Sequence, residues 1–223
     1  MADLFANKKS AKDSSYSAQD IEVLEGLEPV RRRPGMYIGG TDETAMHHLV
    51  NEIFDNAMDE AVAGYASTIE FEMKPDNLIV IRDDGRGIPI DPHPKFPKKS
   101  ALEVILTMLH SGGKFGGKVY DTSGGLHGVG ISVVNALSDY LEVEVVRNKE
   151  IFRQSYSRGE PTSKLKNIGT DAKSKGGTTV AFTPDPDIFG KSAKFKPEKL
   201  YKLARSKAYL FRGVEIKWIC DPS

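Results

Sequence analysis

One amphipathic segment, from about residue 42 to Gly64, dominates the hydrophobic pattern of this chain. Apolar residues recur there every three or four positions, which predicts a helix that ends near a glycine C-cap. Its apolar face comprises Leu49, Ile53, Ala57 and Ala61, widened by Val50, Phe54 and Met58. A second face has polar residues at i, i+3, i+4 and i+7, namely Glu52, Asp55, Asn56 and Asp59, with His48 one turn earlier.

Alternating apolar and polar residues after this helix predict strands. They cover residues 69–73, 78–81, 141–145, 151–156, 178–182 and 214–220. Further helices are predicted after a Ser100–Glu103 capping box, over residues 131–137 and over Pro197–Phe211. In the last of these, we expect Leu200, Leu203, Ala204 and Leu210 to point inward and Lys199, Lys202, Arg205 and Lys207 to point outward.

The remaining segments are predicted to be irregular. Residues 1–15 are rich in Ala, Ser, Lys and Asp, and we expect a disordered tail. Ile21, Leu24 and Leu27 suggest a short helical turn, and residues 28–37 a basic, proline-punctuated loop with three solvated arginines. Residues 91–99 and 158–177 are expected to be loops.

The order of these elements predicts an α+β fold. We expect a two-layer sandwich, with a mixed, mostly antiparallel sheet and helices on one face. Residues 16–223 would form a single domain.

Composition excludes several classes of protein. The chain has 223 residues, 39% hydrophobic and 28% charged, which is ordinary for a soluble globular domain. Its formal net charge of zero argues against a nucleic-acid-binding domain by overall charge. A single cysteine, Cys220, excludes a disulfide framework and fits a reducing cytoplasm. No apolar run reaches the ~20 residues that span a membrane, and the polar N-terminus is no signal peptide.

The polar face of the first helix admits two interpretations. A solvated face usually pairs its acids with Lys or Arg four residues away, yet neither occurs from His48 through Met73. Unpaired acids are tolerated where a cation such as Mg²⁺ lies between them. Asn56 would then be a neutral oxygen ligand, and Glu52 could take a proton from water. A plain solvated face is the alternative.

Two glycine-containing segments carry the other candidate chemistry. The strand at 78–81 runs into Asp83-Asp84-Gly85-Arg86-Gly87-Ile88-Pro89, a typical ligand position, although simple turns use the same residues. Eight glycines follow between Ser111 and Gly130. Gly112–Gly117 indicates a mobile lid with one cation. Gly124–Gly130 leads into a helix, where exposed N–H groups favour phosphate, and a flexible linker is the alternative.

These motifs are more specific together than singly. The P-loop, the dinucleotide fingerprint and the kinase motifs are absent. Present instead are Glu and Asn one helical turn apart, a strand ending in Asp-x-Gly-x-Gly, and a Gly-x-x-Gly-x-Gly helix start. The three boxes resemble those of the GHKL (Bergerat-fold) ATPases. With Arg31–Tyr37 and Leu109–Phe115, they resemble the N-terminal ATPase region of bacterial type II topoisomerase B subunits, from about Tyr16 onward. Residues 22–34 resemble the topoisomerase IV branch more than the gyrase branch.

The resemblance implies a role for each candidate residue. Glu52 would be the general base, oriented by His48, and Asn56 would ligate the Mg²⁺ that bridges the phosphates of ATP. Asp83 would accept a hydrogen bond from the adenine amino group, with a water shared by Thr178. The adenine would be bordered by Arg86, Gly87, Ile88 and Pro89. The phosphates would be held by Gly113, Lys114, Leu126, His127, Gly128, Val129 and Gly130.

The resemblance also implies partners. Tyr16 would reach the nucleotide of the other subunit in an ATP-dependent homodimer, and Arg147 would mark the edge where aminocoumarin inhibitors bind. The enzyme would use Mg-ATP to drive DNA strand passage, decatenation and relaxation in the cytoplasm, together with the topoisomerase A subunit. In the family a second ATPase subdomain supplies a Lys to the γ-phosphate. We therefore expect an N-terminal fragment that binds nucleotide, hydrolyses it slowly and stays mostly monomeric.

Two other functions are weighed against this one. The first is a nucleotide-gated clamp, as in mismatch-repair or heat-shock relatives, whose output is dimerisation. The second is a phosphotransferase resembling sensor histidine kinases, but no phospho-accepting helical hairpin precedes Glu52. For the basic residues of 197–211, we expect solvation, with DNA contact as the alternative.

Overall fold

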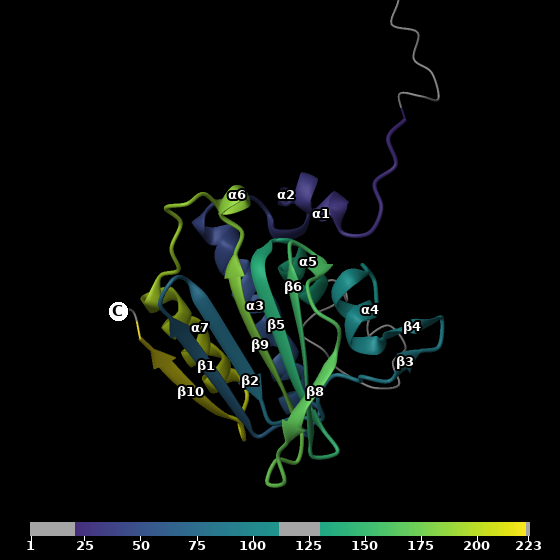
Figure 1. Ribbon diagram of the computed structural model, residues 1–223. Coiled ribbons are helices and arrows are strands. Elements are labelled where there is room, and N and C mark those ends of the chain that lie inside the picture. Colours follow the sequence, from purple (N-terminus) through teal and green to yellow (C-terminus); the bar gives the residue numbers. More distant parts are fainter. Residues whose placement is uncertain (1–20, 112–129, 222–223) are drawn as a thin grey trace, which may run out of the picture.

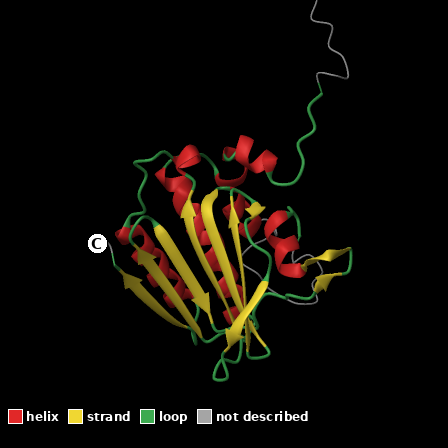
Figure 2. Cartoon of the chain, viewed as in Figure 1, coloured by secondary structure: helices red, strands yellow, loops and turns green. Residues whose placement is uncertain are grey.

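A curved sheet in front and helices behind it make up the two layers of the molecule (Figures 1 and 2). The computed structural model describes residues 21–111 and 130–221. Within that part, eight strands form one sheet in the order β10-β1-β2-β9-β5-β6-β7, with β8 also on β6. Only the β1–β10 pair among them is parallel. The strands are β1 (Thr68–Lys74), β2 (Leu78–Asp83), β5 (Ser138–Arg147), β6 (Glu150–Ser157), β7 (Glu160–Pro161), β8 (Lys166–Thr170), β9 (Gly177–Pro184) and β10 (Glu215–Cys220).

The helices cover one face and one end of this sheet, which confirms the predicted fold class. Four of them lie behind or beside the sheet in Figure 1: α3 (Glu43–Val62), α4 (Ala101–Thr107), α5 (Gly130–Ala136) and α7 (Pro197–Leu210). Three short helices lie at its upper end: α1 (Glu28–Arg32), α2 (Gly35–Ile38) and α6 (Pro186–Phe189). A small hairpin, β3 (Pro92–His93) and β4 (Phe96–Ser100), precedes α4.

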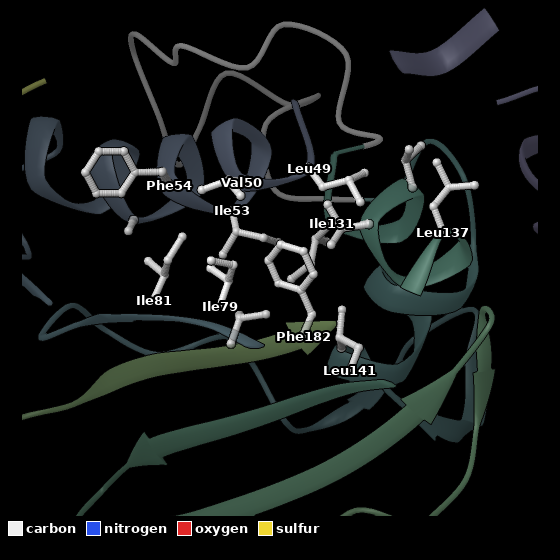
Figure 3. Close-up of a cluster of buried hydrophobic side chains, with 14 of the residues drawn as sticks. Leu49, Val50, Ile53, Phe54, Ile79, Ile81, Ile131, Leu137, Leu141 and Phe182 are labelled. Atoms are coloured by element: carbon white, nitrogen blue, oxygen red, sulfur yellow. The ribbon is translucent and has the colours of Figure 1, made fainter. Parts of the chain in front are cut away.

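The long helix α3 begins and ends where its sequence predicts. The Asp42 carboxylate caps its first turn by accepting a hydrogen bond from the Ala45 N–H at 2.8 Å. Just past its end, Gly64 has a φ of +80°, a conformation that favours glycine. The apolar face of α3 then packs on the sheet. In Figure 3, side chains of α3 lie over those of three strands, and the labelled ones include Leu49, Ile53, Ile79, Phe182 and Leu141.

Burial of this face stabilises the fold. Leu49, Val50 and Phe54 have no exposed surface, and Ile53 keeps 2%. Each such side chain contributes about 1.5–3 kcal/mol of transfer free energy. The opposite face of the sheet is polar, with Glu70 directly between Arg82 of β2 and Lys217 of β10. That face therefore remains open to water, as expected for a mostly antiparallel sheet.

The segment after residue 27 is helical and not the predicted loop, and of its three arginines Arg32 and Arg33 are exposed as expected, whereas Arg31 is not. Residues 28–38 contain α1 and α2, while residues 21–25 have no helical turn. The guanidinium of Arg31 donates to the carboxylate of Asp185 at 2.8 Å and to the Ala136 carbonyl at 2.6 Å. Asp185 is fully buried. This arginine is therefore a structural link between α1, α5 and the start of α6.

Four further expectations were wrong. The predicted loop at 91–99 contains the β3–β4 hairpin, and the one at 158–177 contains β7 and β8. In α7, Leu210 is 73% exposed and does not point inward. Lys207 points inward, because its ammonium group meets the carboxylate of Asp55 on α3. A local hydrophobic pattern could not reveal an acid on another helix.

Candidate functional site

Two motifs that are distant in the sequence meet at the end of β2. Asp83, the last residue of β2, pairs in register with Thr178 of β9. Only 6% of Asp83 is exposed, and its carboxylate accepts a hydrogen bond from the Gly85 N–H at 2.9 Å. Burial, aided by the neighbouring charge of Glu60, raises the pKa of Asp83 to about 7. A buried carboxyl that titrates near neutrality marks a functional site more often than a structural turn.

The tandem aspartates divide into two roles. Asp84 turns to the surface, where its carboxylate accepts hydrogen bonds from the Ser67 and Thr68 N–H groups at 2.7 and 2.8 Å. Its partial burial works against ionisation, but these bonds hold the pKa of Asp84 below its usual value. Asp84 therefore fastens the turn, and only Asp83 is directed inward.

Glycines let the backbone close around Asp83. Gly87 has a φ of +75°, and a Cβ there would lie 2.7 Å from the Val146 carbonyl oxygen. A Cβ on Gly177, just before Thr178, would overlap the Asp83 carbonyl oxygen. Real Cβ atoms do not approach oxygen so closely, so side chains at either position would push the strands apart. The loop of residues 84–89 is thereby packed against the ends of β5 and β9.

An ion pair anchors the same loop to α3. Glu60 accepts hydrogen bonds from the Arg86 N–H at 3.0 Å, from its Nε at 3.1 Å and from its Nη2 at 2.7 Å. The Arg86 guanidinium also lies 3.6 Å from the centre of the Tyr65 ring. This fork-like geometry fixes the plane of the guanidinium. The local sequence pattern offered no signal for it, since the two charged residues are 26 positions apart.

Two more predicted residues join this group. The hydroxyl of Thr178 accepts a hydrogen bond from the Ile88 N–H at 3.3 Å. Arg147, at the end of β5, donates from Nη1 to the Gly87 carbonyl at 2.8 Å. Pro89 is exposed, and Ile88 is half-buried against the core. The structure thus brings Asp83, Arg86–Pro89, Arg147 and Thr178 together.

Gly130, the last glycine of the glycine-rich motif, lies against the acidic helix α3. A Cβ built on Gly130, the first residue of α5, would overlap Oε2 of Glu52. The backbone of α5 therefore begins directly against the carboxylate of Glu52. Asn56, one turn further along α3, is half-buried, and His48, one turn before Glu52, is exposed. Other predicted residues lie outside the described residues: Tyr16, Gly113, Lys114, Leu126, His127, Gly128 and Val129.

The acidic face of α3 is not unpaired, as its local sequence had suggested. Two acids on this side of the helix have partners from distant segments, since Lys207 meets Asp55 and Arg86 meets Glu60. The lack of Lys or Arg between residues 48 and 73 is therefore weaker support for a metal ion than the sequence alone suggested.

A pocket of about 320 Å³ lies at the opposite end of the sheet and includes none of the predicted site residues. Its lining includes Asn77, Thr183 and Phe189. Because Asp83 and Thr178 lie at the other ends of β2 and β9, this pocket is distinct from the site described above.

Comparison with known proteins identifies the class of this domain. Residues 41–188 match the family described as histidine kinase-, DNA gyrase B-, and HSP90-like ATPase. This stretch contains the acidic helix, the Asp83 loop and Thr178, and the chain belongs to that family. The helix and glycine motifs had indicated the same family, and membership implies that the domain binds ATP.

Three named relatives are B subunits of DNA topoisomerase 4 or DNA gyrase. The chain is 63% identical to the B subunit of DNA topoisomerase 4 from Rickettsia felis, over 99% of this chain and 34% of the relative. It is 61% identical to the B subunit of DNA topoisomerase 4 from Caulobacter vibrioides, over 97% of this chain and 31% of the relative. The chain is 53% identical to the B subunit of DNA gyrase from Staphylococcus aureus, over 91% of this chain and 31% of the relative. The chain thus spans about a third of the curated relatives it matches.

A solved structure has the same fold. The 43K ATPase domain of Thermus thermophilus gyrase B, in complex with an aminocoumarin, superposes with a TM-score of 0.77 at 45% identity. The match covers 87% of this chain and 48% of that chain. None of the described helices is long and apolar enough to cross a membrane.

Proposed function

We propose that this chain is the ATP-binding and ATP-hydrolysing domain of a type II DNA topoisomerase B subunit of the topoisomerase IV kind. The single observation that carries the proposal is the meeting of Asp83 and Thr178, within a domain of this ATPase family. Identity of 61–63% to topoisomerase 4 B subunits, against 53% to a gyrase B subunit, favours topoisomerase IV over gyrase. The whole enzyme would use ATP to drive DNA strand passage, decatenation and relaxation.

In this proposal, Asp83 recognises the adenine ring. A carboxylate offers only acceptors, which suits the exocyclic amino group of adenine. The buried position of Asp83 strengthens such a bond, because water competes little there. Thr178 beside it would share a bridging water, and Gly87, Ile88 and Pro89 would border the ring. The Glu60 and Tyr65 contacts of Arg86 would keep its side chain at the outer edge of the adenine.

Glu52 would activate the attacking water as general base, and His48 would orient the Glu52 side chain. The carboxylate lies against the first residue of α5, where the glycine-rich motif ends. Phosphate oxygens held by that motif would therefore come close to Glu52. General-base catalysis requires this kind of proximity between the base and the water that it deprotonates.

The donor set also fits Mg²⁺. Among the described residues, no three His, Cys, Asp or Glu side chains cluster as a metal site. Mg²⁺ commonly takes one or two protein oxygens and fills its octahedron with nucleotide phosphates and water. The amide oxygen of the half-buried Asn56 would be that protein ligand. When bound, Mg²⁺ would neutralise charge on the phosphates.

Most of the remaining residues of the proposal, apart from Gly130 and Arg147, lie outside the described part of the chain. Lys114, Gly113 and Leu126–Val129 would hold the phosphates together with Gly130, and Tyr16 would reach the second protomer of an ATP-dependent homodimer. Arg147, which is bound to the Gly87 carbonyl, would form the edge of an aminocoumarin site. The topoisomerase A subunit and DNA would be the partners, and the bacterial cytoplasm the location. The predicted tail of residues 1–15 lies outside the described residues, and the residues after it would form one domain.

Glu52→Ala tests the assignment of the base. We expect ADP affinity within about threefold of wild type, and a single-turnover rate of ATP hydrolysis roughly a hundredfold lower or less, as for a lost general base. Glu43→Ala is the matched control, because Glu43 lies at the far end of the same helix, where it pairs with Lys199. Equal rates in the two variants would refute the role of Glu52, and loss of ADP binding would show that the carboxylate is structural.

A further inference from the structure

The segment Lys191–Arg212 carries an excess of positive charge in a chain that is neutral overall. It holds eight of the 31 basic residues and one of the 31 acidic residues, a net charge of +7. The rest of the chain is therefore acidic by the same amount. Such asymmetry within one chain indicates a local anion-binding surface, which the overall charge conceals.

Three of these eight cations face inward or pair with α3. Lys196 and Lys199 meet the carboxylate of Glu43 at 3.8 and 2.8 Å, and Lys207 meets Asp55. They dock α7 on α3. The other five are exposed, and none of them forms an ion pair with any residue in 21–111 or 130–221: Lys191, Lys194, Lys202, Arg205 and Arg212.

The outward face of α7 also carries exposed aromatic rings. Tyr201 is 49% exposed and Tyr209 is 73% exposed, one helical turn on either side of Arg205. The Arg205 guanidinium lies 5.4 Å from the Tyr209 ring. Tyrosine hydroxyls and guanidinium groups are frequent donors to nucleic-acid phosphates. The helix has 14 residues, a length of about 21 Å, so these donors could follow several phosphates of one strand.

We propose that the outward face of α7, with Arg212 after its end, binds the phosphate backbone of duplex DNA. The choice of DNA as the anion rests on the proposed function, whereas the basic surface itself does not. An anionic membrane is a poorer fit, because insertion needs an apolar helix face. Leu200 and Ala204 of α7 are buried in the core, and Leu210, its last residue, is the one aliphatic side chain among the exposed large hydrophobic residues of this helix, so α7 presents no continuous apolar face.

This surface lies beside the nucleotide site. α7 is packed on α3 through Lys207 and Asp55, and Asp55 is one residue before Asn56. In Figure 1, α7 lies behind β1 and β10, at the edge of the sheet. DNA on the outer face of α7 would therefore be one helix away from the proposed catalytic residues.

The test is the salt dependence of binding to a fluorescent duplex of about 20 base pairs, measured by anisotropy on this chain. Each lost phosphate contact should reduce the slope of log Kobs against log salt by about 0.9. For Lys202→Ala/Arg205→Ala/Arg212→Ala, we expect a slope smaller by about two to three and binding weaker by about tenfold or more at low salt. The control is Lys164→Ala/Lys166→Ala/Lys173→Ala, which removes equal charge from exposed positions elsewhere and should bind as wild type.

Either of two results would overturn the proposal. Equal losses in the two triple variants would show that only net charge matters, and no salt-dependent binding by the wild type would show that the face is merely solvated. ADP titration of the same variants separates failure of the DNA-binding proposal from failure of the proposed function. Unchanged ADP affinity with unchanged DNA binding refutes the DNA surface and leaves the ATPase assignment intact.

Discussion

Lys207 of α7 forms an ion pair with Asp55 of α3, three residues after Glu52 and one before Asn56. The two side chains are 22% and 25% exposed, so water screens their attraction only in part. The pair places a positive charge on the face of α3 that also carries Glu52 and Asn56. It therefore offsets repulsion between neighbouring carboxylates on one helix face.

Lys207→Met should leave the Asp55 carboxylate half-buried without its cation. We expect a loss of about 1–2 kcal/mol of unfolding free energy, between the values for exposed and buried pairs. Urea denaturation measures it, with Lys202→Met of the same helix as the exposed control. Adding Asp55→Asn to Lys207→Met should recover most of the loss. Strictly additive effects of the two substitutions would show that the pair contributes nothing.

The raised pKa of Asp83 predicts that adenine binding depends on pH. Burial raises the pKa of Asp83 to about 7, and the ionised form is the better acceptor for an amino group. Affinity should therefore be full well above pH 7 and be lost as the pH falls through it, by about tenfold between about pH 8 and pH 6. Adenosine is the suitable ligand, since it has no titrating phosphate, and its binding can be followed by NMR titration. A flat profile would contradict the role of Asp83.

Gly87→Ala should disrupt the loop around Asp83. The new Cβ would lie 2.7 Å from the Val146 carbonyl oxygen, at a φ of +75°. We expect a loss of about 2–4 kcal/mol, from backbone strain plus the clash. Gly190→Ala is the control, because Gly190 has a φ of +89° with nothing within 4 Å of the new atom. The thermal unfolding temperature of Gly87→Ala should be clearly lower than that of Gly190→Ala. Similar losses of stability in the two variants would mean that backbone strain alone acts at Gly87.

Asp185→Ala should be among the most destabilising single substitutions in this chain. The fully buried carboxylate accepts from Arg31 at 2.8 Å and pairs with Arg158 at 3.1 Å. Removing it would leave Arg31 without its carboxylate and α6 without its N-cap, at a cost of about 3–5 kcal/mol. Arg158 would keep its pairs with Asp139 and Asp187. Asp187→Ala is the control, since Asp187 meets Arg158 at 2.8 Å but is 58% exposed. A loss below about 1 kcal/mol for Asp185→Ala in denaturant unfolding, the value of an exposed pair, would disprove this account.

The sequence was sufficient for the elements with strong periodicity. The apolar stripe of α3 and the alternation of β1 each follow from local spacing, and the structure confirms both. The end of a buried strand marked Asp83 and Asp84 together as candidates, and the family resemblance then selected Asp83. Local patterns could not separate Asp83 from Asp84, since the difference lies in hydrogen bonds to Ser67 and Thr68.

The errors at Arg31 and Lys207 share one physical cause, which is charge pairing between distant segments. Arg31 and Lys207 look solvated in their own helices, and each is drawn inward by an aspartate more than 150 positions away. The Glu60–Arg86 pair was missed for the same reason. Such partners depend on how helices dock on the sheet, which no local period encodes.

Calorimetric titration of ADP into this chain, with and without Mg²⁺, tests the central claim most directly. We predict saturable one-to-one binding that strengthens with Mg²⁺ and weakens by about tenfold or more in Asp83→Asn, whose amide can present a donor to adenine. No saturation up to millimolar ADP, roughly −4 kcal/mol, or unchanged affinity in Asp83→Asn, would contradict the assignment of this site.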